Sequence, residues 1–177
     1  MGPAVDPLFI VIAVALIAAL LIHAAATKLA DRVLFEQHLA AYGVSPALQL
    51  AASWLLPIAE AAAVVAMLTP WRGAGAAVAL GLLLLYAAVM AWHLARGHRP
   101  DCGCGGEPIR LSWWLVARNL FLASIAAIAS LPATDRPLGV ADFGVAAAAL
   151  MLAACLYAAL HQVLRQRRDS TPTLWRT

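Results

Sequence analysis

Residues 8–27 read LFIVIAVALIAALLIHAAAT, a run in which His23 is the one titratable side chain. An α-helix needs about 20 predominantly apolar residues to cross the hydrocarbon core of a bilayer. The run carries no polar stripe of the kind that faces water on a surface helix. Residues 1–7 contain no Lys or Arg, so the basic segment of a secretory signal is missing and the run is expected to be retained. This stretch predicts a transmembrane helix.

Four further apolar runs of similar length follow, separated by short connections. Of the 177 residues, 64% are hydrophobic and 12% are charged, and the mean hydropathy is +0.84. An average soluble protein is about half apolar and a quarter charged. We therefore predict an all-α polytopic membrane helix bundle of about five transmembrane helices, forming a single integral membrane domain over residues 1–177. The expected spans are 8–27, 48–68, 74–95, 111–131 and 140–164.

The connection at 28–42 has a different pattern, because apolar and charged residues alternate there at helical spacing before Gly43 and Pro46. We interpret it as a continuation of the first helix along the membrane interface. An ordinary amphipathic connector of this type needs no further function.

The basic residues stand mainly at the ends of the apolar runs. The formal charge is +3 and the pI is about 9.1, yet this placement is typical of membrane topology and indicates no nucleic-acid site. Nine basic residues fall on one face of the predicted bundle and two on the other. The positive-inside rule therefore predicts an outside N-terminus and a cytoplasmic first face. The first face holds Lys28, Arg32, Arg96, Arg99, Arg110, Arg165, Arg167, Arg168 and Arg176, and the second holds Arg72 and Arg136.

The connection at 96–110 concentrates the reactive side chains. Residues 98–108 read HRPDCGCGGEP, which places Cys102 and Cys104 on either side of one glycine. Two thiols at this spacing close a small, strained disulfide, and strain makes such a bond labile and suited to exchange. Neighbouring Arg99 and Arg110 favour the thiolate that attacks a disulfide. We predict that these two cysteines form the catalytic redox pair.

Metal binding is the alternative chemistry for the same loop. Cys102, Cys104, His98 and His93 offer soft donors for copper(I), zinc or another thiophilic ion. Structural zinc sites usually separate their cysteines by two to four residues, so the C-x-C spacing suits structural zinc less well. Two unreactive loop cysteines are the third interpretation.

Three polar residues within the spans require an explanation, because ionisable groups at this depth are costly and usually face a partner inside the bundle. Glu60 lies in the second span, and Arg118 and Asn119 lie in the fourth. Two interpretations stay open: a structural Glu60–Arg118 ion pair, or a pocket for a quinone head group or a substrate. His23 and His93, at span ends, are read as snorkelling or helix-terminal residues.

The order of these residues resembles a known family. The residues that carry the resemblance are His23, Lys28, Asp31, Phe35, Leu39, Tyr42, Pro46, Leu56, Pro57, Glu60, the CGCGG segment at 102–106, Arg118 and Asn119. They are similar to those of the methylamine utilisation protein MauE family and the wider DoxX-like membrane proteins, over about residues 20–130. The cysteine motif followed one span later by the Arg-Asn pair is the most specific part.

The resemblance implies a bacterial-type inner membrane protein with a four-helix core, in the style of the DsbB and vitamin K epoxide reductase (VKOR) disulfide enzymes. It implies that Cys102 and Cys104 are the redox pair and that a thioredoxin-like protein is the partner. A disulfide-containing protein such as methylamine dehydrogenase would be the client. Lys28, His23, His93, His98, Glu60, Arg118 and Asn119 would then support a pocket beneath the cysteine loop, with a quinone as the cofactor it would accept.

The leading functional hypothesis is therefore a membrane thiol–disulfide oxidoreductase. A soft-metal carrier and a non-catalytic membrane anchor for a redox partner are the alternatives. The charge count places the cysteine loop in the cytoplasm, whereas a direct oxidase of periplasmic proteins needs its cysteines outside. A cytoplasmic loop favours electron uptake from a cytoplasmic thiol.

Overall fold

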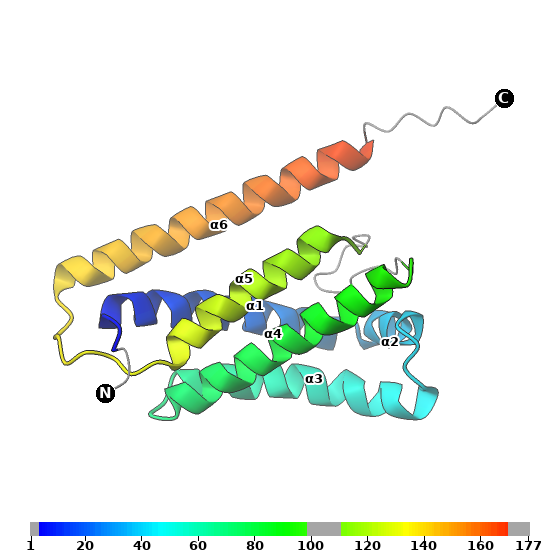
Figure 1. Cartoon of the computed structure of the whole chain (residues 1–177), viewed down its shortest axis with the longest axis horizontal. Helices are drawn as coiled ribbons and strands as arrows, with labels where there is room; N and C mark the ends of the chain where they lie inside the picture. Colours follow the sequence, from blue (N-terminus) through cyan, green and yellow to red (C-terminus); the bar gives the residue numbers. More distant parts are fainter. Residues whose placement is uncertain (1–3, 99–110, 170–177) are drawn as a thin grey trace. The chain divides into compact units, whose positions relative to one another are not determined.

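The computed structural model describes residues 4–98 and 111–169, and the chain divides into two compact units, Met1–Arg136 and Pro137–Thr177. In the first unit the helices are α1 (Pro7–Ala30), α2 (Arg32–Ala41), α3 (Pro46–Met67), α4 (Arg72–Ala95) and α5 (Trp113–Ser130). The second unit contains α6 (Val140–Asp169) (Figure 1). Among the residues that the structure describes, five helices are long and apolar enough to cross a membrane: α1, α3, α4, α5 and the Val140–Ala159 part of α6. The predicted polytopic membrane helix bundle is confirmed.

Four of these helices form a closed ring in the first unit. α1 packs against α3 and α5, and α4 packs against the same two helices from the opposite side. Figure 1 shows that α1 and α4 end, and α3 and α5 begin, at the same end of this unit, where α2 also lies. We call this the α2 end; Ala30, Ala95, Pro46 and Trp113 mark it.

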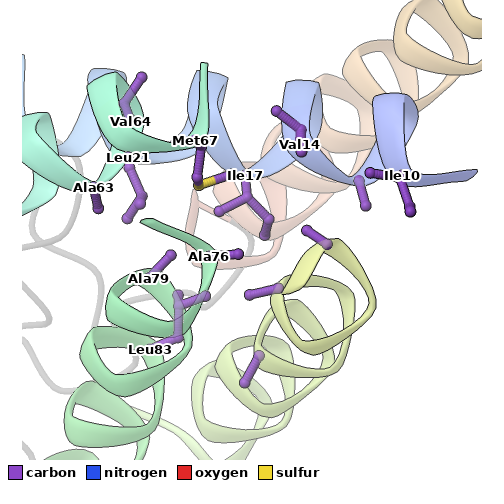
Figure 2. Packing of buried hydrophobic residues seen from close by; sticks show 14 residues of the cluster. Ile10, Val14, Ile17, Leu21, Ala63, Val64, Met67, Ala76, Ala79 and Leu83 are labelled. Carbon is purple, nitrogen blue, oxygen red and sulfur yellow. The ribbon is translucent and has the colours of Figure 1, made fainter. Parts of the chain in front are cut away.

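The opposite end of the ring is filled by aliphatic and alanine side chains (Figure 2). Ile17 and Leu21 of α1 and Leu83 of α4 are almost fully buried there, and Ala76 and Ala79 of α4 belong to the same cluster. Lipid tails are as apolar as leucine, so packing of small residues rather than hydrophobic burial draws such helices together. This end of the bundle leaves little space between helices.

The backbones of α3 and α4 come into close contact at Gly75. A Cβ atom built on Gly75 would lie 2.7 Å from the Ala63 carbonyl oxygen and 2.9 Å from the Ala66 carbonyl carbon. Both are backbone atoms of α3, which cannot move aside as a flexible side chain would. Glycine is therefore required for the α3–α4 contact.

The first helix and the amphipathic segment are two helices, so the predicted continuation is wrong. α1 ends at Ala30, and Asp31 has φ −132° and ψ 78°, outside the helical region. The Asp31 carboxylate then accepts a hydrogen bond from Leu34 N at 2.9 Å and caps α2. Aspartate favours such a cap because its side chain satisfies a free backbone N–H of the first helical turn.

Polar contacts hold α2 against α3. Arg32 donates to Glu36 at 3.2 Å and to the buried hydroxyl of Ser53 at 3.3 Å, and Ser53 donates to Glu36 at 3.0 Å. The Arg32 guanidinium also lies 4.0 Å from the centre of the Trp54 ring. These contacts attach the amphipathic helix to the start of the second span.

Backbone and charge contacts join the chain segments at the other end of the unit. Val5 N donates to Pro132 O at 3.0 Å, and Thr134 N donates to Val5 O at 2.9 Å. Arg136 and Asp6 form an ion pair at 2.9 Å, while Arg72 donates to the Leu131 carbonyl at 3.0 Å beyond α5.

The second unit is described by itself. Its helix α6 is preceded by a turn in which Gly139 N donates to the Asp142 carboxylate at 2.8 Å, and Asp142 lies in the first turn of α6. The single membrane domain expected over residues 1–177 stays a prediction.

The close α3–α4 approach leads to a stability prediction. Gly75→Ala should destabilise the protein by about 1–3 kcal/mol, because the added methyl overpacks a backbone contact. Gly81→Ala is the matched control on α4, since nothing lies within 4 Å of a Cβ there. It should be neutral or stabilise by up to about 1 kcal/mol. Unfolding in detergent, followed by circular dichroism, measures both; equal effects of the two substitutions would contradict the close packing.

Candidate functional site

The predicted redox cysteines lie outside the described residues. Cys102 and Cys104, with Arg99 and Arg110, belong to the connection between the end of α4 and the start of α5. This connection joins two helices at the α2 end of the bundle. The residues that the structure describes at that end therefore form the surroundings in which the cysteine connection begins and finishes.

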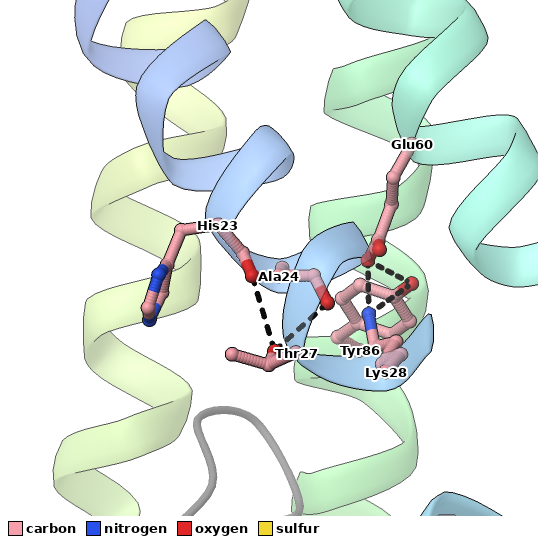
Figure 3. A network of polar contacts seen from close by, with 6 residues as sticks. All are labelled: His23, Ala24, Thr27, Lys28, Glu60 and Tyr86. Atoms are coloured by element: carbon pink, nitrogen blue, oxygen red, sulfur yellow. Dashed lines mark hydrogen bonds and ion pairs between the residues drawn. The ribbon is translucent and has the colours of Figure 1, made fainter. Parts of the chain in front are cut away.

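A polar triad lies between α1, α3 and α4, formed by the buried Lys28 and Glu60 and the half-buried Tyr86 (Figure 3). Lys28 Nζ donates to Glu60 Oε1, and the Tyr86 hydroxyl donates to the same oxygen at 2.7 Å. Lys28 Nζ also lies 3.4 Å from the Tyr86 hydroxyl oxygen. The Lys28 side chain is 7% exposed and that of Glu60 is 0% exposed. Both charges of the ion pair are thus shielded within the protein.

Lys28 can reach Glu60 because α1 continues to Ala30, beyond the apolar run 8–27, so that Lys28 is part of the helix. Thr27 keeps its hydroxyl satisfied within the helix, at 3.1 Å from the His23 carbonyl and 3.0 Å from the Ala24 carbonyl. A polar side chain that bonds its own helix in this way needs no water. Lys28 then points inward from the final turns of α1, toward Glu60, as Figure 3 shows.

The predicted Glu60–Arg118 ion pair is wrong, because Lys28 occupies that place. Glu60 Oε1 is bonded by Lys28 and Tyr86. Asn119 is buried but donates to Leu115 O of its own helix at 2.9 Å, and Arg118 Nε has no hydrogen-bond partner within the described residues. The sequence did not identify Lys28 as the partner, because its long side chain extends from the helix end into the span.

A cavity of about 240 Å³ lies beside the triad and is bordered by Lys28 and Tyr86. Apolar side chains of α2, α3 and α4 form most of its wall. Glu60, Arg118 and Asn119 are not among its lining residues, so the pocket predicted from those three is displaced toward α2. The lining residues are Lys28, Phe35, His38, Leu39, Tyr42, Val44, Ala52, Leu56, Leu85, Tyr86, Val89 and Met90.

Sequence reasoning did not identify Tyr86 or His38 as site residues. Tyr86 stands in the run LLLLYAAVM at 82–90, where a lone hydroxyl in an apolar span was the available signal. Such a group needs a hydrogen-bond partner inside the bundle. His38 is one of the polar residues that alternate with apolar ones in the segment 28–42, and in the structure it borders the cavity.

The histidines divide into two groups. His93 packs edge-to-face on Tyr42, with ring centres 4.9 Å apart, and His98 lies 6.2 Å from His93 between ring centres. His93 Nδ1 is buried without a partner among the described residues. His23 is exposed, and Figure 3 shows its ring directed away from the triad.

The described part of the chain does not provide a complete set of ligands for the alternative function, metal binding. In that part, no group of three or more His, Cys, Asp or Glu side chains is placed to hold an ion. His93 and His98 lie near each other, and the two remaining predicted ligands, Cys102 and Cys104, fall outside the described residues.

Comparisons with known proteins find one family and one curated relative. The family model described as methylamine utilisation protein MauE matches residues 5–132, which is most of the first unit. The methylamine utilization protein MauE of Paracoccus denitrificans is 41% identical over 76 residues, a segment that is 41% of this chain and 41% of that protein. The matched segment thus spans less than half of that relative. No solved structure matches at the same level of significance.

The triad leads to a prediction about coupled charges. Glu60→Gln should destabilise the protein by about 3–5 kcal/mol, because it leaves the buried Lys28 ammonium uncompensated. Adding Lys28→Met should recover part of this loss, so the two substitutions should be strongly non-additive in a double-mutant cycle of detergent unfolding.

The surface pair provides the control for this cycle. Arg32 and Glu36 are 30% and 34% exposed, so Glu36→Gln should cost no more than about 1 kcal/mol. Additive effects of Glu60→Gln and Lys28→Met would show that the two charges do not depend on each other.

Proposed function

The chain belongs to the family of the methylamine utilisation protein MauE, and from this membership and its cysteine pair we propose that it is a membrane redox-maturation factor. Cys102 and Cys104 would cycle between dithiol and disulfide and exchange with a thioredoxin-like protein. The client would be a disulfide-containing protein. The name of the relative places that protein in methylamine utilisation, and we propose the same context for this chain.

The observation that carries the proposal is the C-G-C segment in the connection between α4 and α5. A disulfide across one intervening residue is strained, which raises its reduction potential and makes it reactive. In the exchange, one thiolate of the reduced partner attacks the Cys102–Cys104 disulfide and forms a mixed disulfide. The partner's second thiolate then attacks that bond, so the partner leaves with a disulfide and this chain becomes the dithiol. Two electrons and two protons pass from the partner to this chain.

The α2 end of the bundle suits this role because its polar groups lie near the helix ends that the cysteine connection joins. His93 is on the last turn of α4, and His98 lies in the first residues of the connection. Arg96 is exposed at the same place, with its guanidinium 3.8 Å from the centre of the Trp92 ring. Cationic and imidazole groups near a thiol favour the reactive thiolate.

We propose that the cysteine connection faces the cytoplasm and the N-terminus faces outside, in a bacterial inner membrane. Burial in the triad removes Lys28 from the charges that act at the interface, but the α2 end keeps Arg32 and Arg96. At the opposite end, Arg72 is bonded to backbone carbonyls and Arg136 is paired with Asp6. This asymmetry agrees with the positive-inside rule. The electrons would then come from a cytoplasmic thiol.

Thiol labelling tests the proposal and its orientation together. Cys155 of α6 is a free, exposed cysteine and would react as well, so it is replaced by serine. In this Cys155→Ser background, a membrane-impermeant maleimide should label Cys102 and Cys104 only after the cells are opened. Treatment with an oxidant should abolish the labelling, and a reductant should restore it, because the disulfide blocks both sulfurs. The triple Cys→Ser variant provides the unlabelled control.

Other outcomes would change specific parts of the proposal. Labelling of intact cells would reverse the orientation and favour a periplasmic disulfide oxidase. Labelling that no oxidant changes would contradict the redox pair. Protection of the thiols by copper(I) or zinc, but not by an oxidant, would favour the soft-metal function that the nearby rings of His93 and His98 also permit.

A further inference from the structure

The cavity beside the triad has the size of a small ring. Its volume of about 240 Å³ is below the range of roughly 300–1,000 Å³ that holds drug-sized ligands. A ligand there would place a single ring head group inside, and any longer tail would lie outside the cavity, among apolar side chains or lipid.

The walls of the cavity favour a flat, uncharged molecule. Leucine, valine and methionine side chains form much of the lining, and aromatic rings stand at the polar end. Lys28 Nζ lies 5.7 Å from the centre of the Phe35 ring and 5.0 Å from that of Tyr86. Because Glu60 already balances the charge of Lys28, an anionic ligand would bring an uncompensated charge into this apolar site.

The triad nevertheless has an unused hydrogen-bond donor. A lysine ammonium carries three N–H groups, and within the described residues Lys28 Nζ has two acceptors, Glu60 Oε1 and the Tyr86 oxygen. The third N–H is therefore available at the border of the cavity. A ligand oxygen that accepts from this N–H would add a hydrogen bond and so stabilise the complex.

We propose that this cavity binds the ring of a lipid-soluble quinone, with Lys28 Nζ donating a hydrogen bond to a ring carbonyl. The proposal rests on the thiol–disulfide function, because the quinone is the electron acceptor. Closing the Cys102–Cys104 disulfide releases two electrons and two protons. A quinone that receives two electrons and two protons becomes the hydroquinone, so the exchange balances.

A cavity-filling substitution tests the site without touching the triad. Ala52 lines the cavity, whereas its neighbour Ala51 on α3 is exposed. A short-tailed ubiquinone should bind saturably to the purified full chain in phospholipid nanodiscs. Ala52→Phe should weaken this binding at least about tenfold, and Ala51→Phe should change it by no more than about twofold. Equal affinities of the two variants, or no saturable binding, would overturn the proposal.

The hydrogen bond is tested by the Lys28→Met, Glu60→Gln double variant, which removes both charges together. It should weaken quinone binding about fivefold or more, because the carbonyl loses its donor. An alkyl compound of matched tail length without carbonyls should not displace the quinone. Displacement by that compound would show that the cavity is a slot for a lipid tail, which contradicts the proposal.

A variant without the two loop cysteines distinguishes the quinone-binding proposal from the thiol–disulfide proposal. The Cys102→Ser, Cys104→Ser variant should bind the quinone with unchanged affinity, because it keeps Lys28 and every described residue of the cavity wall. Saturable binding in a protein whose thiols show no reversible oxidation would leave the cavity proposal standing and reject the redox function. Reversible thiol oxidation without saturable quinone binding would reject the cavity proposal alone.

Discussion

The ion pair between Lys28 and Glu60 is the interaction on which the α2 end of the bundle depends. The bilayer core has no water to solvate an ammonium or a carboxylate, so each charge requires the other. Lys28 comes from the end of α1 and Glu60 from the middle of α3, and Tyr86 joins them from α4. The pair, together with Tyr86, therefore fixes the register of three helices at once. One N–H of the Lys28 ammonium remains for a further acceptor.

The two ends of the bundle differ in how closely they are packed. Toward the α3–α4 turn, alanine and glycine positions allow the backbones to approach, and Gly75 marks the tightest contact. Toward α2, larger side chains and the triad keep the helices apart and border a cavity. A rigid end combined with an open end is a suitable arrangement for a binding site, because the packed half holds the helices that line the cavity in place.

Much of the fold was predictable from the sequence, because apolar runs long enough to cross a bilayer indicate transmembrane helices directly. The five spans were located to within a few residues, and Glu60 was recognised as a buried charge that needs a partner. The partner was not predicted. Lys28 stands at a span end, where a lysine usually snorkels to the interface, and only the three-dimensional packing shows that its side chain turns inward. The helix break at Asp31 was missed for a related reason, since helical periodicity continues across it and the cap is made by one side chain.

A redox titration of the purified protein in glutathione buffers, with free thiols quantified by alkylation, tests whether Cys102 and Cys104 form a redox pair. We expect one reversible two-electron transition that disappears in Cys102→Ser and persists in Cys155→Ser. Its potential should be less reducing than that of a structural disulfide, roughly above −300 mV. Thiols that stay reduced at every potential, or a transition that survives Cys102→Ser, would contradict the claim that this cysteine pair carries the function.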